Sequence, residues 1–491
     1  MKRKLPFLPV FPFLLPLFFV LHGVAENAAY IDIRDCWGLL GVYMAVTVAL
    51  YLLLYLFYRD HSRTALAVGT LQGIFFFFGA LHGFLSRYVP LLSKYIIILP
   101  LLAILLVVIL IRLKKSSFSP RRPVLFINIL FLIYILFDLI RLGLPDDAYR
   151  RRLSLTSPYT MPPQAPDSTY PDVYLLLMDE YASTSSLKTW FNYDNSSLDS
   201  FLSNEGFRLL PASRSNYNFT SFSMASMLNM SYLKGLGNEC TIADYASCNK
   251  LIRNSEAVRS FSMHGYDIIN YSIFDLDDQP STVNEHLLPV KTNLITAQTL
   301  LGRIRRDIGW NIYSLPLHIG WIRQWAYQVM DNNNGFIAGV EKTSSTRTGR
   351  PRFIYAHLQM PHNPFFYDKQ GRLKEPKEME QNIEGYLDYL PYTNEVIKKL
   401  VTAIQQHSHR SAVIMLMGDH GVRYDVRGGG DPDDLHYFQN LNAVYFPDKD
   451  YHLFYDSVSG VNQFRIVFSR IFHQNIPLLR DSTILLKDRQ Y

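Results

Sequence analysis

Charged residues and cysteine are both scarce in this chain of 491 residues. Only 18% of the residues are Asp, Glu, Lys or Arg, and there are three cysteines. Cys240 and Cys248 are close in sequence, so they form either one disulfide or two buried thiols. We find no internal repeat and no low-complexity tract, which excludes a repeat array. Charge is scarcest before residue 145, where nearly all the long apolar runs lie.

Five apolar stretches in this first third have the length of membrane-spanning helices. Each gives roughly 20 mostly apolar residues, enough to cross about 30 Å of hydrocarbon at 1.5 Å per residue. We therefore expect residues 1–145 to form a transmembrane bundle of about five helices. The first stretch follows three basic residues, so a cleaved signal peptide is the alternative to an anchor there. The stretches cover about 7–25, 38–58, 64–85, 94–113 and 123–144.

Basic residues fall on one side of this bundle if the segments alternate. By the positive-inside rule that side is cytoplasmic, and an odd number of crossings then places everything after residue 145 outside. We thus expect a multi-pass protein of the inner or cytoplasmic membrane with a periplasmic or extracellular domain. With Asp60, these basic residues contribute +9 to a net charge of +6, which leaves −3 for the rest. A nucleic-acid-binding face is therefore not implied. The basic residues are Lys2, Arg3, Lys4, Arg59, Arg63, Arg112, Lys114, Lys115, Arg121 and Arg122.

The pattern changes after the last apolar stretch. Residues 146–170 are rich in proline and polar residues, which favours an extended linker, and residues 171–491 read as a separate domain. This domain contains three short apolar runs, at 172–178, 353–358 and 412–417, of the kind found in strands buried on both faces. Helix-like stretches lie between them. We expect an α/β domain with a largely parallel sheet, in which ligands bind at the carboxyl ends of the strands.

Acidic residues and histidine follow two of these predicted strands. Asp179 and Glu180 come directly after the first, and Asp419 and His420 follow the third between two glycines. Because parallel strands end at one edge of a sheet, these distant side chains are expected to converge. Carboxylate and imidazole groups suit a divalent cation, and the glycines permit a tight turn.

The remaining predicted strand also carries imidazole groups. His357 lies within it, and His362 follows it in a Pro-rich turn. A plain turn or a solvated loop accounts for any one of these residues alone. Their recurrence at three strand ends favours a site.

A hydroxyl nucleophile is expected in the polar loop that leads into the helix-like stretch at 221–233. Thr220 stands where a helix N-cap would be, and capping alone is a sufficient reason for a threonine there. A functional interpretation adds that a nearby divalent cation favours the alkoxide, while amides of the first helical turn hold an anionic group. Ser221 and Ser223 compete for the same role.

Together these residues resemble the alkaline phosphatase superfamily. More narrowly, they resemble its membrane-anchored sulfatase-like branch, which includes lipoteichoic acid synthases and lipid A phosphoethanolamine transferases. The resemblance rests on four short motifs in order: Met178-Asp-Glu-Tyr-Ala182, Thr220-Ser-Phe-Ser-Met-Ala-Ser-Met227, His362-Asn-Pro-Phe365 and Asp419-His420. It implies a three-layer sulfatase-like fold with a largely parallel central sheet.

The resemblance also implies roles for individual residues. Thr220 is the expected nucleophile, and the expected metal ligands are Glu180, Thr220, Asp419 and His420, with Asp179 as an alternative to Glu180. Zinc and manganese both suit this donor set. On the substrate side the resemblance implies His362, and Arg214, His357 and His436 lie near the motifs.

The expected activity is a metal-dependent phosphotransfer. The enzyme would move a phosphoethanolamine or phosphoglycerol headgroup from a membrane lipid to a cell-envelope glycan or glycolipid, through a covalent Thr220 intermediate. The alternatives are a sulfatase-like ester hydrolase and a non-catalytic membrane binding protein. No Cys/Ser-x-Pro-x-Arg motif occurs, which argues against formylglycine chemistry. Asn195, Asn218 and Asn229 begin Asn-x-Ser/Thr triplets, but a glycan on Asn218 would stand two residues from the nucleophile, which fits a bacterium better than a eukaryotic secretory host.

Overall fold

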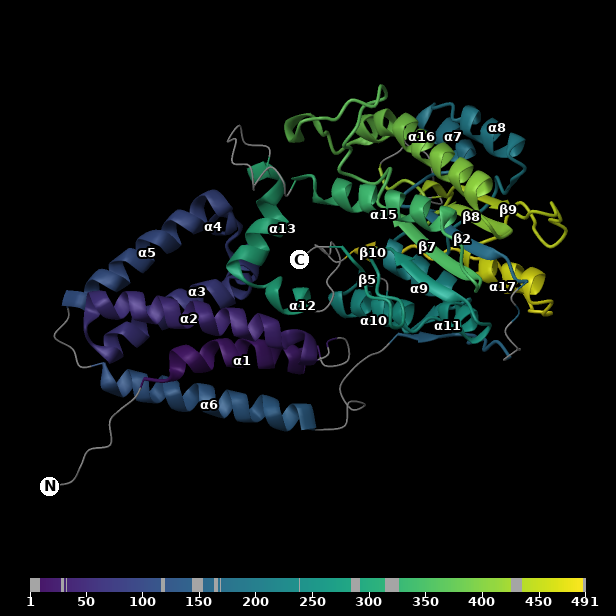
Figure 1. The fold of residues 1–491 in the computed structure, drawn as a ribbon. Helices are drawn as coiled ribbons and strands as arrows, with labels where there is room; N and C mark the ends of the chain where they lie inside the picture. The colour runs from purple at the N-terminus through teal and green to yellow at the C-terminus, as the bar shows by residue number, and fades with distance from the viewer. Residues whose placement is uncertain are drawn as a thin grey trace. The chain divides into compact units, whose positions relative to one another are not determined.

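The computed structural model consists of two compact units (Figure 1). The first comprises Met1–Arg150, Leu287–Ile312 and Tyr491, and the second comprises Arg151–His286 and Tyr313–Gln490. Within these bounds the structure describes residues 9–27, 31, 33–115, 120–143, 153–162, 167, 169–237, 239–283, 292–313, 326–424 and 435–488. The start of the first predicted span and much of the predicted linker lie outside these residues.

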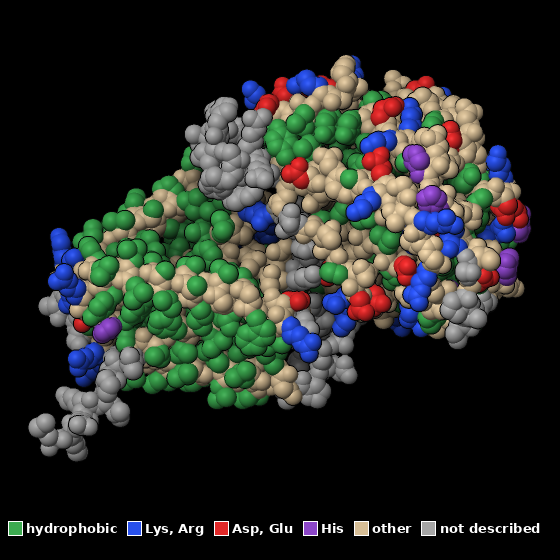
Figure 2. Space-filling view, viewed as in Figure 1, with side chains coloured by type: hydrophobic (Ala, Val, Ile, Leu, Met, Phe, Trp, Pro, Cys, Tyr) green, Lys and Arg blue, Asp and Glu red, His purple; other side chains and the backbone are tan. Residues whose placement is uncertain are grey.

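Apolar helices make up the first unit. Four of its helical segments are long and apolar enough to cross a membrane, whereas α1 is apolar but only 16 residues long. Leucine, isoleucine, valine and phenylalanine side chains of these helices are widely exposed, and they cover most of this unit's face in Figure 2. The helices are α1 (Phe11–Glu26), α2 (Trp37–Tyr58), α3 (His61–Tyr88), α4 (Pro90–Ser93), α5 (Tyr95–Lys115) and α6 (Arg121–Gly143).

Basic residues of two helix connections meet at one end of this unit. Arg63, at the start of α3, donates from Nη1 to the carbonyl oxygen of Lys114 at 3.1 Å. Lys114 in turn donates from Nζ to the carbonyl oxygen of Phe57 at 3.2 Å. Phe11, at the start of α1, packs with side chains from the starts of α3 and α6 at the same end. Consecutive helices of alternating direction produce this arrangement.

Two helices from far along the chain also belong to the first unit. They are α12 (Asn293–Thr296) and α13 (Leu300–Tyr313). Ile295 packs into an apolar cluster with α1, and the amide of Gly79 donates to the carbonyl oxygen of Gln298 at 2.8 Å. The Tyr95 hydroxyl donates to Asp307 at 2.5 Å. The sequence of this segment does not distinguish it from the C-terminal domain, because its helical pattern resembles that of any surface helix.

The second unit is built on a six-stranded sheet of order β3-β9-β8-β2-β7-β6. The central strand β2 pairs in parallel with β7 and β8, and β6 continues in parallel beyond β7. Only β9 runs against its neighbours, so the sheet is mixed but largely parallel, as predicted. Every residue of β2, β7 and β8 is buried, which explains their continuous apolar sequences. The strands are β2 (Asp172–Met178), β3 (Arg208–Leu209), β6 (Asp267–Tyr271), β7 (Arg352–Leu358), β8 (Ala412–Gly418) and β9 (Asn442–Tyr445).

Helices cover both faces of this sheet and complete three layers. In Figure 1, α7, α8 and α16 lie on one side, and α9, α10, α11 and α17 lie on the other. Two small ladders flank the sheet: β1 (Ser154–Leu155) with β4 (Leu233–Lys234), and β5 (Glu239–Cys240) with β10 (Lys487–Asp488). The helices are α7 (Thr184–Phe191), α8 (Ser196–Asn204), α9 (Thr220–Leu228), α10 (Ile242–Arg253), α11 (Glu256–Met263), α15 (Gln328–Ser345), α16 (Ile383–His407) and α17 (Gly460–Ile471).

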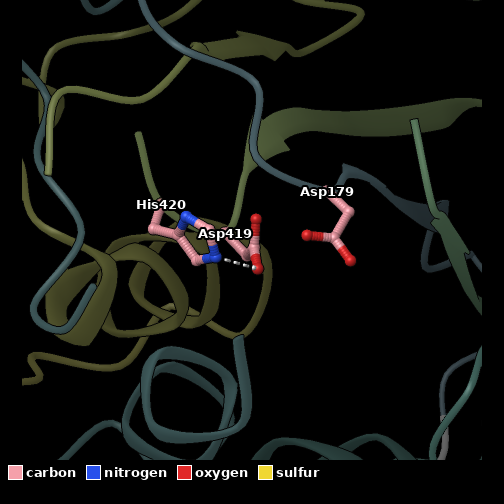
Figure 3. Close-up of side chains that lie close together, drawn as sticks. All are labelled: Asp179, Asp419 and His420. Atoms are coloured by element: carbon pink, nitrogen blue, oxygen red, sulfur yellow. Dashed lines mark ion pairs between the residues drawn. The ribbon is translucent and has the colours of Figure 1, made fainter. Parts of the chain in front are cut away.

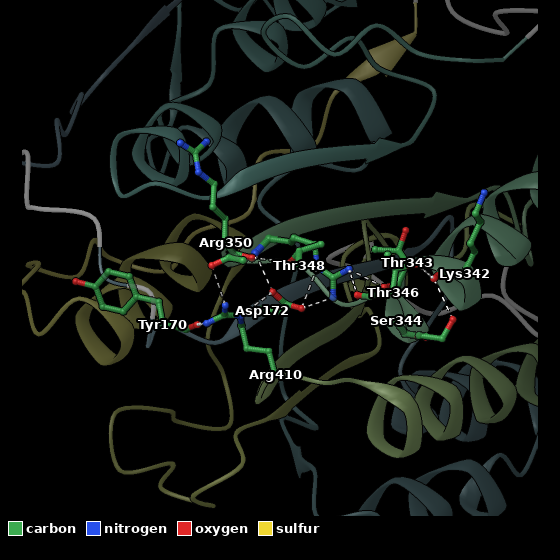
Figure 4. A network of polar contacts seen from close by, with 12 residues as sticks. Tyr170, Asp172, Lys342, Thr343, Ser344, Thr346, Thr348, Arg350 and Arg410 are labelled. Atoms are coloured by element: carbon green, nitrogen blue, oxygen red, sulfur yellow. Dashed lines mark hydrogen bonds and ion pairs between the residues drawn. The ribbon is translucent and has the colours of Figure 1, made fainter.

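A buried ion pair fixes the amino ends of the central strands (Figure 4). Asp172, the first residue of β2, accepts from Nε and Nη2 of Arg352, the first residue of β7, at 3.0 and 2.5 Å. The Arg352 amide adds a third bond at 2.8 Å, and Arg410, just before β8, lies 3.8 Å from the same carboxylate. Because the strand starts are joined in register, their carboxyl ends are aligned at the opposite edge.

Cys240, Cys248 and the asparagines of the three Asn-x-Ser/Thr triplets are all buried. Burial raises the pKa of the Cys248 thiol well above its usual value. Asn195, Asn218 and Asn229 are also buried, and their side-chain amides hydrogen-bond to neighbouring protein groups. In the folded protein none of these amides is accessible to a glycan.

Candidate active site

The ends of β2 and β8 bring two carboxylates and an imidazole together (Figure 3). Asp179 follows β2, and Asp419 and His420 follow β8. Each offers one ligand atom, and these atoms all lie within 4.8 Å of one another. All three side chains are buried. The convergence predicted from the strand ends is therefore present.

The two glycines that flank the Asp-His pair are required by close backbone packing. A Cβ on Gly418 would lie 2.4 Å from the carbonyl oxygen of Tyr181, and one on Gly421 would lie 2.0 Å from that of His436. Both distances are shorter than any real Cβ contact, so only glycine fits. The turn that carries both candidate ligands thus depends on residues without side chains.

The orientation of His420 suits metal binding. Its Nδ1 lies 2.8 Å from the carbonyl oxygen of Gly421, which can only accept, so Nδ1 carries the proton and Nε2 has a free lone pair. That Nε2 lies 3.3 Å from Oδ2 of Asp419, another acceptor. Among the described residues, Oδ2 of Asp419 and Oδ1 of Asp179 are buried without a hydrogen-bond partner. A cation fits between these acceptors, because it would satisfy all of them.

The two consecutive acids after β2 point in different directions. Glu180 has a left-handed backbone, with φ of 63°, and its Oε1 accepts from the Arg423 amide at 2.8 Å. Arg423 also brings its Nε to 3.4 Å from that oxygen. The structure therefore groups Asp179, rather than the expected Glu180, with Asp419 and His420. A ligand role for Glu180 stays a prediction, and Asp179 joins the candidates.

Neighbouring side chains favour the ionised form of both acids. Burial by itself raises the pKa of Asp179, but His362 and the contact with His357 outweigh it, so this pKa lies well below its usual range. Burial also raises the pKa of Glu180, and Arg423 and His362 bring it below the ordinary value. Asp179 can therefore act as a charged ligand in the group that it forms with Asp419 and His420.

Thr220 is the first residue of α9, and its hydroxyl does not cap the helix. The N-cap position is held by Phe219, which makes no side-chain cap, so the expected Thr220 cap is not formed. Instead Oγ1 of Thr220 lies 3.3 Å from Nε2 of His420. Of the two competing hydroxyls, Ser221 is fully buried, and Ser223 donates to the carbonyl oxygen of Asp419 at 2.6 Å. Thr220 is the partly exposed one of the three.

The predicted substrate-side residues occupy three different environments. His362 is partly exposed, with Nε2 3.0 Å from Nη2 of Arg423 and 3.8 Å from Oε2 of Glu180. His357 is fully buried behind Asp179, 3.5 Å from its Oδ2, which suits a positioning role rather than substrate contact. The Arg214 side chain is exposed, and its backbone bridges two other segments. His362 is the one that joins the site.

Arg423 was not predicted from the sequence, although this residue connects the parts of the site. Its guanidinium contacts Glu180 and His362 and lies over the ring of Phe219, 5.4 Å from the centroid. Burial by itself lowers the pKa of Arg423, but the adjacent carboxylates raise this pKa by more than burial lowers it. The guanidinium therefore stays charged. A single arginine three residues after His420 gave no recognisable spacing signal.

A sulfatase family model matches residues 311–456. The chain carries a sulfatase-like domain. The match includes His362, Asp419 and His420, whereas Asp179, Glu180 and Thr220 lie outside it and reach the site through the fold. The resemblance to the alkaline phosphatase superfamily, and with it an enzyme of the sulfatase-like hydrolase or transferase class, is thereby confirmed.

Solved structures similar to the chain include both branches of this class. One is a Bacteroides thetaiotaomicron protein from a study of glycosaminoglycan metabolism (12% identity, TM-score 0.38, 61% of this chain and 72% of that chain). A second is the C-terminal periplasmic domain of EptC from Escherichia coli in complex with zinc (13%, 0.37, 64% and 86%). A third is the soluble domain of lipooligosaccharide phosphoethanolamine transferase A from Neisseria meningitidis (11%, 0.36, 63% and 90%). No curated protein matches the sequence.

Proposed function

We propose that the protein is a membrane-anchored, metal-dependent phosphotransferase. It moves a phospho-headgroup from a lipid to a cell-envelope acceptor through a covalent intermediate on Thr220. The observation that carries this proposal is the position of the Thr220 hydroxyl, 3.3 Å from Nε2 of His420 at the edge of the Asp179–Asp419–His420 cluster. A hydroxyl beside such a cluster is the arrangement that an activated nucleophile needs.

A divalent cation fits the donor set of the site. Asp179, Asp419 and His420 would hold it, together with Glu180 or Thr220, and zinc and manganese both suit these donors. When bound, it supplies positive charge that favours the deprotonated hydroxyl and offsets the charge of the phosphoryl oxygens.

The residues of the chain have separate tasks in the two transfer steps. In the first, a bond forms between Oγ1 of Thr220 and phosphorus while the bond from phosphorus to the lipid oxygen breaks. The hydroxyl proton passes from Oγ1 to water as that bond forms, and the departing lipid oxygen takes a proton from water. His362, whose Nε2 lies 3.0 Å from Nη2 of Arg423, contributes to binding of the donor. In the second step, an acceptor hydroxyl attacks phosphorus and loses its proton to water while the bond from phosphorus to Oγ1 breaks. Oγ1 then takes a proton from water, and Thr220 is restored.

A membrane lipid is the donor that suits the rest of the chain. Four helices long and apolar enough to span a membrane keep the catalytic domain at a bilayer surface. The positive-inside pattern places that domain outside the cytoplasm, where glycans and glycolipids of the envelope supply acceptor hydroxyls.

Mass spectrometry of the full-length protein tests this proposal. The detergent-solubilised, metal-loaded chain is incubated with phospholipid carrying an isotope label in its headgroup, and the peptide containing Thr220 is analysed. We expect a labelled phospho-headgroup on Thr220 in the wild type and none in Thr220→Ala. Ser221→Ala is the matched control, because it removes a buried hydroxyl one residue away and should retain the adduct. A wild-type chain that is never labelled on Thr220 would contradict the proposal.

A sulfatase-like ester hydrolase is the second candidate, favoured by the family match. In that case water replaces the acceptor in the second step. Release of free headgroup phosphate at the same rate with and without added glycan would identify the hydrolase. Labelled glycan product would identify the transferase. A chain that releases and transfers nothing, with Thr220→Ala lacking any phenotype in the host, would point to the non-catalytic binding protein.

A further inference from the structure

A pocket of about 530 Å³ opens beside the proposed nucleophile. Its wall includes the aromatic rings of Phe219 and Tyr424 and the cationic side chains of Arg423 and Lys487. Glu180 also lines it, so the pocket adjoins the metal-ligating edge of the sheet. The volume is in the range of small-molecule sites. A substrate group attached to the reacting phosphorus therefore has a defined place to bind.

One wall of this pocket is the C-terminal segment of the chain. Leu485, Leu486 and Lys487 line it, although their sequence carries none of the motifs that define the rest of the site. The segment continues as β10, which pairs in parallel with β5. It lies alongside the loop before Thr220, where the Ile484 amide donates to the carbonyl oxygen of Asn216 at 2.9 Å.

Asn218 clamps this segment two residues before the nucleophile. Its Nδ2 donates to the carbonyl oxygen of Leu486 at 3.0 Å, and its Oδ1 accepts from the Leu486 amide at 2.9 Å. Asn218 is only 5% exposed, so both bonds are shielded from water. These two hydrogen bonds from the Asn218 side chain to the Leu486 backbone fix the position of Lys487 relative to Thr220.

The charges of the pocket do not cancel. Arg423 is matched by Glu180, with which it forms an ion pair. Lys487 is exposed and forms no ion pair among the residues that the structure describes. Among the lining residues that the structure describes, one positive charge is therefore left over, and Lys487 carries it on the pocket wall.

We propose that Lys487, presented by the C-terminal strand, is a specificity-determining residue that selects a donor headgroup without a positive charge. A phosphoglycerol headgroup carries the phosphodiester charge alone and fits the excess cation, whereas the amine of a phosphoethanolamine headgroup is repelled by it. This inference rests on the proposed phosphotransfer. It chooses between the phosphoethanolamine and phosphoglycerol headgroups, both of which are compatible with that function.

Donor preference in the full-length protein tests the inference. Wild-type chain is compared with Lys487→Glu, Lys487→Arg and Lys188→Glu on labelled phosphatidylglycerol and phosphatidylethanolamine in detergent micelles. We expect the wild type to prefer phosphatidylglycerol, and Lys487→Glu to raise KM for that donor about tenfold while kcat changes little. Lys487→Arg should restore the preference, and Lys188→Glu, an exposed lysine on α7, should leave it intact.

A binding measurement separates this inference from the proposed function. Calorimetric titration of Thr220→Ala with glycerol phosphate and with phosphoethanolamine needs no turnover. Tighter binding of glycerol phosphate that is lost on adding Lys487→Glu supports the subsite, even if lipid never labels Thr220 in the wild type. Equal binding of both probes, or an equal effect of Lys487→Glu on both donors, would overturn the subsite while leaving phosphotransfer standing.

Discussion

Oγ1 of Thr220 lies 3.3 Å from Nε2 of His420, although 200 positions separate the two residues. The contact is supported one turn further along α9, where Ser223 donates to the carbonyl oxygen of Asp419 at 2.6 Å. The first turn of the helix therefore holds both the side chain and the backbone of the Asp-His turn. Movement of that turn would displace the hydroxyl and the candidate ligands together.

Removing the imidazole of the cluster should abolish stabilisation by metal. For His420→Gln we expect zinc to leave the melting temperature unchanged, because the cluster loses a ligand. In the wild type, zinc at 100 times its Kd should add about 2.7 kcal/mol to the free energy of unfolding. Thermal denaturation of the full-length chain, with and without zinc after chelator treatment, measures both.

His409→Gln is the matched control, because His409 is exposed and lies outside the cluster. Its response to zinc should equal that of the wild type. An undiminished zinc response in His420→Gln would mean that the ion binds elsewhere.

A methyl group added at Gly421 should disrupt the Asp-His turn. The new Cβ would lie 2.0 Å from the His436 carbonyl oxygen, which is backbone and cannot simply rotate away. For Gly421→Ala we expect a destabilisation of about 1–3 kcal/mol, the usual cost of overpacking, and loss of Thr220 labelling. Gly335→Ala in α15 is the control: nothing lies within 4 Å of its Cβ. It should stabilise by about 0.5–1 kcal/mol in chemical denaturation. Equal effects of the two substitutions would refute the steric argument.

The parts of the fold that were predictable are those buried on both faces. In β2 and β8 every residue is buried, so the apolar run in the sequence and the strand in the structure cover nearly the same residues. β3 and β9 were missed, because strands of two and four residues carry too few apolar residues to form a pattern. The same limit applies to β10, of which Lys487 lines the pocket.

Which of the two acids after β2 turns toward the Asp-His pair was not predictable from the sequence. Asp179 and Glu180 are chemically equivalent as neighbours in a sequence. Their roles diverge because Glu180 takes a left-handed backbone and turns its carboxylate to Arg423. That conformation depends on tertiary contacts, so no local pattern distinguishes the two acids.

Neutralising Asp172 should destabilise the catalytic unit without touching the site. Asp172 is fully buried and bonded to Arg352 through three donors, so Asp172→Asn leaves a buried guanidinium without its counter-charge. We expect a loss of about 3–5 kcal/mol in the free energy of unfolding, measured by urea denaturation. Arg350→Ala, which breaks the exposed pair with Asp267, should cost less than about 1 kcal/mol. Comparable losses in both variants would show that burial does not set the strength of this pair.

Asp307 should carry a pH-dependent part of the stability of the helical unit. It accepts from the Tyr95 hydroxyl at 2.5 Å and from Nε of Arg306 at 2.7 Å. Burial raises its pKa, but these two contacts outweigh burial and bring the pKa below the ordinary value. A carboxylate with a lowered folded-state pKa contributes stability that is complete above the unfolded pKa, about 3.9, and is lost as pH falls through the folded value.

Asp307→Asn tests that dependence. At pH 7 we expect the variant to melt below the wild type in detergent, with a loss of about 1–3 kcal/mol, because charge-assisted bonds become neutral ones. The difference should shrink as the pH falls below about 3.9, since the wild-type carboxyl then takes up a proton. Asp456→Asn is the control, because its pair with Arg208 is exposed and should matter little at any pH. A difference that stays constant from pH 7 into the acid range would show that Asp307 acts through its shape rather than its charge.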